Sequence, residues 1–295
     1  MATLKALKTR IGSVASSEKI TGAMKMISSA KVHKNEQELK KLLPFKDQVK
    51  SIMGHLLDTD IDFNSPLINE REVKRVGVVI YGTDDGLCGA YNMNIFKRFL
   101  IEKAHIRENF GEDVEITLIP VGKKVAKACL KLRERNLRAM VIPGVDSKMD
   151  AKTVNDFTYS LRNDFESGIY DRVEVIYMKF ISMGKQVPTV DQLYPVSRES
   201  IEAEGKGSED NKMYIFEPDP NSIFNEVLPM FVLSTMQEIT IENRASEQAA
   251  RVMAMQAAND NAKKLLESLQ LEYNKLRQQG ITTELLDILG GQIGR

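Results

Sequence analysis

Between Met230 and Gln279 the chain runs for fifty residues without a glycine or a proline. Apolar and small residues recur there with an average spacing of 3.5, the period that predicts a left-handed supercoil with another helix. A helix over 222–288 would be roughly 100 Å long, because each residue adds 1.5 Å. That length exceeds the diameter of a small domain. The helix must therefore project from the rest of the molecule and pair with a partner of similar length.

The predicted seam of this helix contains many polar or small residues. Its positions are Val227, Phe231, Ser234, Glu238, Ile241, Ala245, Gln248, Val252, Met255, Asn259, Ala262, Leu266, Leu269, Tyr273 and Leu276. The stretch 245–262 is poor in large apolar side chains, and seven of its eighteen residues are alanine. Small seam residues let two helices approach closely. Arg251 and Met253 lie off the seam, on the outer face of the helix.

The N-terminus supplies the partner helix. Residues 3–57 form a helical pattern roughly 80 Å long, with Thr3 as N-cap and apolar residues spaced three and four apart. Gly12 and Gly22 weaken this helix locally, and Pro44 can kink it. If both long helices start near the same compact unit, they pair antiparallel and form a rod.

Between the two helices the pattern changes to alternating strands and helices. Strands are predicted at 73–82, 114–122, 137–144 and 173–183, with further strands at 188–196 and 213–218. Helices are predicted at 93–106, 123–135 and 150–167. This alternation predicts an α/β unit with a mostly parallel sheet. The acidic, glycine-containing segment 198–212 reads as an exposed loop.

The turn 82–92, GTDDGLCGAYN, follows a strand and precedes a helix, where phosphate-binding loops lie. It lacks the lysine of a Walker A motif and the spacing of a dinucleotide fingerprint, and Asp84 and Asp85 would repel a phosphate. We expect a tight turn in which glycines supply positive φ. A nucleotide-dependent enzyme with a coiled-coil arm and a static coiled-coil adaptor are the alternatives.

Other chemistry is not indicated. The histidines and cysteines are scattered without metal-ligand spacing, so we expect no metal, no cofactor and no disulfide: His33, His55, His105, Cys88 and Cys129. No motif of a catalytic triad or zinc protease occurs, so we expect no catalytic site. No apolar run is long enough to span a membrane.

Charge distinguishes the two ends of the chain, although the formal net charge is zero. Residues 1–50 carry eleven basic and four acidic side chains, whereas residues 222–290 carry six and nine. The paired rod is therefore net basic, which suits an acidic partner surface. Nucleic acid is disfavoured, because no aromatic side chain interleaves with the basic residues of the first forty-four positions.

Three groups of motifs resemble the gamma subunit of F-type ATP synthase. They are TLKALKTRIGSVASSEKITGAMKMISSAK at the N-terminus, GLCGAYN after the first strand, and ASEQAARVMAM with YNKLRQQGITTELLDI near the C-terminus. The resemblance implies an α/β fold class: a long antiparallel coiled coil with an inserted Rossmann-like domain. The division would be 1–57 and 222–290 for the two coiled-coil helices, and 73–218 for the α/β domain.

The resemblance also implies a non-catalytic rotor subunit. Its partners would be the alpha and beta subunits of the hexameric ring, the epsilon subunit and the membrane c-ring, and it would couple hydrogen-ion transport to ATP synthesis. The positions that match the family's ring contacts are Met24, Lys25, Arg251, Arg277, Gln278, Thr282, Leu285, Leu286 and Ile288. The last three match the tip held in the ring's apolar collar.

Two positions depart from the family pattern. Asp85 stands where the family usually has a basic residue, and Ala90 where it usually has a second glycine, so contacts of this turn are expected to differ. The regulatory cysteine insert of the chloroplast form is absent. We expect neither a secretory signal nor a transit peptide, which favours a bacterial protein on the cytoplasmic face of the inner membrane.

Overall fold

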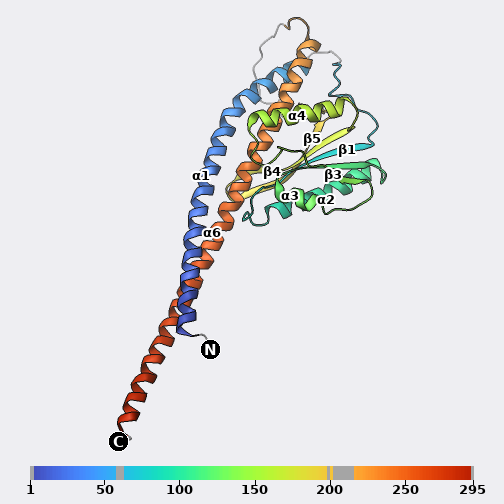
Figure 1. Ribbon diagram of the computed structural model, residues 1–295. Coiled ribbons are helices and arrows are strands. Elements are labelled where there is room, and N and C mark those ends of the chain that lie inside the picture. Colours follow the sequence, from blue (N-terminus) through green and yellow to red (C-terminus); the bar gives the residue numbers. More distant parts are fainter. Residues whose placement is uncertain (1–2, 58–62, 198–199, 202–215, 294–295) are drawn as a thin grey trace.

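The computed structural model describes residues 3–57, 63–197, 200–201 and 216–293. Two long helices form a rod, and an α/β domain lies against one part of it (Figure 1). Helix α1 spans Leu4–Leu57 and helix α6 spans Pro220–Ile293. At 1.5 Å per residue these helices are about 80 Å and about 110 Å long. The predicted combination of a rod and a compact unit is confirmed.

The two long helices pair antiparallel, and α6 extends beyond the start of α1 (Figure 1). Asn259 Nδ2 donates to the Glu18 carbonyl at 2.7 Å and approaches Thr21 Oγ1 at 3.3 Å. Asn259 also packs against Gly22, where a Cβ would stand 3.4 Å from the Asn259 amide nitrogen. Counting fourteen residues along each helix from the Glu18–Asn259 contact brings Leu4 opposite Tyr273. Residues of α6 beyond that point have no α1 residue beside them.

The predicted seam is confirmed where α1 alone covers α6. From 252 to 276 every predicted seam position is buried or half-buried: Val252, Met255, Asn259, Ala262, Leu266, Leu269, Tyr273 and Leu276. Most of the intervening residues are exposed. The start of α1 is capped as predicted, because Thr3 Oγ1 accepts a bond from the Ala6 amide at 3.3 Å.

The α/β domain contains one five-stranded sheet in the order β3-β2-β1-β4-β5. Its elements are β1 (Arg75–Tyr81), α2 (Tyr91–Phe110), β2 (Glu115–Val121), α3 (Lys123–Cys129), β3 (Leu137–Ala139), α4 (Ala151–Glu166), β4 (Arg172–Ser182) and β5 (Lys185–Tyr194). All neighbouring strands are parallel except β4 and β5. A mostly parallel sheet is therefore confirmed.

Each face of the sheet has its own core, because successive strand residues point to opposite sides. Val79 and Tyr81 face α4 and the adjoining ends of α1 and α6. Val78 and Ile80 face α2 and α3. The long helices are thus built into one face of the domain, and the rod and the domain share a hydrophobic core.

Some predicted boundaries were wrong. Helix α3 ends at Cys129 rather than at 135, because the chain turns back through a bridge between Glu134 and Leu137, with Asn136 at a φ of 59°. Strand β3 covers only Leu137–Ala139 of the predicted 137–144. Residues 216–218 form no strand. The remainder of that predicted strand, and nearly all of the loop predicted at 198–212, lie outside the described residues.

Candidate functional site

The direction of the strand order reverses at β1, since the chain proceeds from β1 to β2 and β3 on one side and later adds β4 and β5 on the other. In open α/β sheets, ligands bind outside the carboxyl ends of the strands at this switch point. Here helix α6 occupies that position. Tyr81, the last residue of β1, lies with its hydroxyl 3.0 Å from Thr240 Oγ1, and Asn243 Nδ2 donates to the Gly82 carbonyl at 3.3 Å.

A second contact ties α6 to the start of α2. The hydroxyl of Tyr91 donates to Asn243 Oδ1 at 2.6 Å and also lies 3.2 Å from the Asn243 carbonyl oxygen. Both residues are buried, with 3% and 1% of their surface exposed. Burial raises the pKa of Tyr91 well above its usual value, so this phenol stays a donor at all physiological pH values. We name the α6 segment 240–251 together with the turn 82–92 the junction.

The turn 82–92 has its own carboxylate where a phosphate would need to bind. Asp84 accepts bonds from the Lys123 amide at 2.9 Å, at the start of α3, and from Ser147 Oγ at 2.8 Å. Its neighbour Asp85 forms an ion pair with Lys148 at 3.0 Å, and the hydrogen bond from Lys148 lowers the pKa of Asp85. The expected tight turn is confirmed, but its positive φ values belong to Gly89, at 59°, and to Leu87, at 64°, so glycine does not supply all of them. The Thr83 amide of this turn donates to Asn92 Oδ1 at 3.1 Å.

A buried ion pair completes the junction. Arg251 Nη2 donates to Glu247 Oε1 at 2.6 Å, and Arg251 Nε donates to the Gly86 carbonyl at 3.2 Å. Only 6% of Arg251 and 4% of Glu247 are exposed. Burial raises the pKa of Glu247, and the bond from Arg251 opposes that shift. The pair thereby fastens the turn of the α/β domain to the shaft.

The sequence-predicted contact residues do not form one site. Met24 and Lys25 lie half-buried on α1, and Arg251 is buried in the junction. The others follow one another on the last part of α6, where the described side chains are exposed: Arg277, Gln278, Thr282, Leu285 and Leu286. Thr282 bonds back to the Gln278 carbonyl at 2.9 Å. Ile288 belongs to α6, but its side chain lies outside the described part.

Sequence reasoning missed the junction. It placed Arg251 off the seam, on the outer face of the helix, but the α/β domain covers Arg251 there. It also passed over Asn243, Tyr91 and Glu247. One signal was available, because Glu247 and Arg251 stand four residues apart on a helix, the spacing of a side-chain ion pair. That spacing alone does not tell a buried pair from an exposed one.

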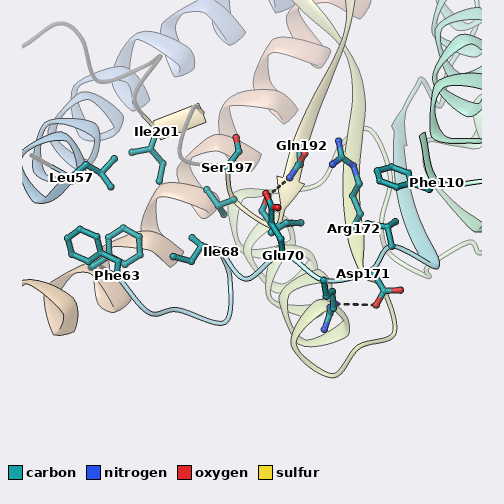
Figure 2. Close-up of a pocket in the computed structure, with 15 residues that line it drawn as sticks. Leu57, Phe63, Ile68, Glu70, Phe110, Asp171, Arg172, Gln192, Ser197 and Ile201 are labelled. Atoms are coloured by element: carbon teal, nitrogen blue, oxygen red, sulfur yellow. Dashed lines mark hydrogen bonds and ion pairs between the residues drawn. The ribbon is translucent and has the colours of Figure 1, made fainter. Parts of the chain in front are cut away.

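A cavity of about 650 Å³ lies at the end of the domain where α1 ends and α6 begins (Figure 2). Its hydrophobic side includes Phe63, stacked on Phe224 with ring centroids 4.4 Å apart. Three of its four charged lining residues have partners within the chain. Arg71 pairs with Asp171 at 3.2 Å, and Arg172 Nε donates to Glu174 at 2.6 Å. The fourth charged lining residue is Glu70, whose carboxylate forms no hydrogen bond or ion pair with the described part of the chain.

Two further observations bear on function. Among the described residues, no cluster of three or more His, Cys, Asp or Glu side chains is placed to hold a metal ion. None of the helices that the described residues form combines the length and the apolarity needed for a membrane crossing.

Solved structures share this architecture. A chain of the mitochondrial ATP synthase rotor of Euglena gracilis, in rotational state 1, superimposes with a TM-score of 0.60 at 19% identity, covering 94% of this chain and 98% of that one. A chain of the OSCP/F1/c-ring structure of the same enzyme, in rotational state 3, gives a TM-score of 0.63 at 22% identity, covering 99% and 94%. At these identities the likeness concerns the fold.

The fold and the junction define a class of protein: a two-helix shaft with an attached α/β domain whose ligand-binding edge holds the shaft. A family model described as ATP synthase matches residues 3–293. The chain belongs to the family of ATP synthase gamma chains, the non-catalytic central-stalk subunits of a membrane-associated complex.

Curated relatives from three bacteria match almost the whole chain. The ATP synthase gamma chain of Bacteroides thetaiotaomicron is 38% identical, covering 99% of this chain and 100% of the relative. The gamma chain of Bacteroides fragilis is also 38% identical, covering 99% and 100%. That of Parabacteroides distasonis is 37% identical, covering 99% and 98%.

Proposed function

We propose that this chain is the central rotor of an F-type ATP synthase. Its coiled coil would stand inside a ring of alpha and beta subunits, and its α/β domain would be held by the epsilon subunit and the membrane c-ring. In this proposal residues 1–57 and 222–290 form the shaft, and residues 73–218 form the α/β domain. The observation that carries the proposal is the junction, because torque applied to the domain needs a rigid connection to the shaft.

Rotation can act on catalytic sites only through differential contact. A ligand or partner shifts a conformational equilibrium only if it interacts differently with the two states. A shaft with an asymmetric surface meets three equivalent subunits differently at each angle, and the linkage between rotor angle and nucleotide affinity is reciprocal. We assign these contacts to Met24 and Lys25 on α1 and to Arg277, Gln278 and Thr282 on α6.

The end of α6 would serve as the bearing. Leu285 and Leu286 are 55% and 62% exposed on the part of α6 that extends beyond α1, and Ile288 follows them on the same helix. Exposed leucines on an unpaired helix suit an apolar collar, which confines the tip without directional bonds. For Arg251 we propose an indirect contribution, since it holds the domain against the shaft.

We place the protein at the cytoplasmic face of a bacterial inner membrane, as a peripheral subunit. The support is its likeness to bacterial gamma chains and the lack of a membrane-spanning helix among the described residues. The alternative, a nucleotide-dependent enzyme with a coiled-coil arm, is disfavoured by the junction, because α6 and Asp84 occupy the places where a nucleotide would bind.

The test is reconstitution with alpha, beta and epsilon chains on c-ring-containing vesicles. We expect ATP-driven proton pumping that requires this chain. A reversible disulfide between cysteines introduced at Arg277 and in a facing beta loop should stop ATP hydrolysis, and reduction should restore it. Full pumping with the disulfide closed would contradict a turning shaft. ATP binding by the isolated chain would support the enzyme alternative instead.

A further inference from the structure

A second cavity, of about 510 Å³, lies between α1, α6 and the β4–β5 pair. This volume is within the range of protein ligand sites, but most lining side chains here are polar or charged, whereas small-molecule pockets are predominantly apolar. Several of these groups are paired within the chain. Lys46 forms an ion pair with Glu238, and the Tyr177 hydroxyl donates to Asp191 Oδ2 at 2.8 Å.

Two polar groups on α6 line this cavity without a partner in the described part of the chain. Glu242 is 7% exposed, and its carboxylate receives no hydrogen bond or ion pair there. Thr235 Oγ1 is buried and also has no hydrogen-bond partner. The two residues are seven positions apart, which is about two helical turns, so both lie on the same side of α6. An unpaired buried carboxylate is costly when ionised, and a cationic donor would offset that cost.

The charges around Glu242 come from every element of the cavity. Glu238 lies on the same helix, Lys46 and Lys50 on α1, Lys179 on β4 and Asp191 on β5. Burial, followed by repulsion from Glu238, raises the pKa of Glu242 to about 7, while Lys179 and Lys46 oppose the shift. The carboxylate is therefore ionised in the cavity at mildly alkaline pH and protonated below about pH 6.

We propose that this cavity receives an arginine side chain of a partner protein, with its guanidinium donating to Glu242 and to the Thr235 hydroxyl. The planar guanidinium suits a carboxylate because it can donate two parallel bonds. Lys179 is exposed beside the same cavity, so an acidic residue next to that arginine completes the complementary charge pattern. This inference goes beyond the rotor function and stands whether or not the shaft turns.

The probe is agmatine, which at pH 8 carries a guanidinium at one end of an alkyl chain and an ammonium at the other, titrated calorimetrically into the full chain at that pH. We expect saturable binding that Glu242→Gln weakens at least about tenfold, because a hydrogen bond to a charged group is lost. The matched control is Glu267→Gln on the exposed face of α6, which should bind as the parent does. At pH 5 binding to the parent should fall on the order of 100-fold, because protonation removes the negative charge.

Two results would overturn the proposal: no saturable binding of agmatine to the parent, or equal binding to the parent and to Glu242→Gln. Thr235→Val provides a second variant, and unchanged agmatine binding to it would contradict the assigned geometry. The assay uses neither ATP nor partner subunits, so its outcome is independent of the rotor test.

Discussion

Replacing Arg251 by methionine should destabilise the chain strongly, because it leaves Glu247 buried without its cation. The change removes the 2.6 Å bond to Glu247 and the 3.2 Å bond to the Gly86 carbonyl. The two paired side chains are only 8% and 5% exposed, so water cannot replace the lost partner. Breaking a buried ion pair by removing one partner costs about 3–5 kcal/mol. Urea unfolding of the full chain at pH 8, followed by circular dichroism, measures this loss.

The chain contains a matched control of the same geometry. Arg162 and Glu166 on α4 are also four residues apart, with a 2.7 Å contact, but their side chains are 33% and 31% exposed. Arg162→Met should therefore cost only about 0.3–0.5 kcal/mol.

A second variant separates the charge effect from lost packing. The double change Arg251→Met, Glu247→Leu should recover most of the loss, because replacing both members of a buried pair by apolar groups is often neutral. The loss in Arg251→Met should also shrink at pH 5, where the buried carboxyl can bind a proton. The reasoning is refuted if Arg251→Met costs no more than Arg162→Met.

Three further predictions concern other parts of the chain. Burial raises the pKa of Glu242 from 4.5 to about 7, so its ionisation lowers the free energy of unfolding increasingly as pH rises from about 4.5 to 7. Glu242→Gln should therefore raise the free energy of unfolding by about 3 kcal/mol at pH 8 and leave it unchanged at pH 4. Thermal unfolding at each pH measures the difference. Gly82→Ala would place a Cβ 2.6 Å from Val125 and should lower the free energy of unfolding by about 1–3 kcal/mol. In Gly12→Ala the new Cβ meets nothing within 4 Å, so this change should raise the free energy of unfolding by about 0.5–1 kcal/mol. The midpoints of urea unfolding measure both effects. Charge reversal at Lys25 and Arg277 should lower proton pumping per ATP hydrolysed while changing the melting temperature little; unchanged coupling would remove both from the contact set.

The seam of the coiled coil could be predicted because it repeats. Where α6 contacts only α1, the buried residues of α6 lie along a single line. The average spacing of 3.5 from Val252 to Leu276 therefore identifies the buried positions. Between 231 and 251 the same helix also meets the α/β domain, so buried residues occur on several sides and the spacing no longer distinguishes them. Polar residues such as Asn243 and Glu247 are then buried, and hydropathy alone cannot show this.

The strands of the α/β domain followed from their apolar runs, but the contacts of the turn 82–92 did not. Asp84 binds the Lys123 amide and Ser147, residues 39 and 63 positions away. Such pairings depend on the sheet bringing the ends of β1 and β2 together. The two unpaired groups of the second cavity, Thr235 and Glu242, lie on one side of α6, but only the packing of β4 and β5 makes that side a cavity.

The amino-acid sequence by itself determined the two long helices, their antiparallel pairing, the α/β unit between them and, through its motifs, the family. These features depend on local propensity and on periodicity, which are written along the chain. Only the tertiary structure decided that α6 occupies the ligand-binding edge of the sheet. It also decided that Arg251 is buried in a contact that holds the α/β domain against α6. The physical reason is that burial of a charged side chain depends on what lies opposite it, and for Arg251 that is a turn 165 residues earlier in the chain.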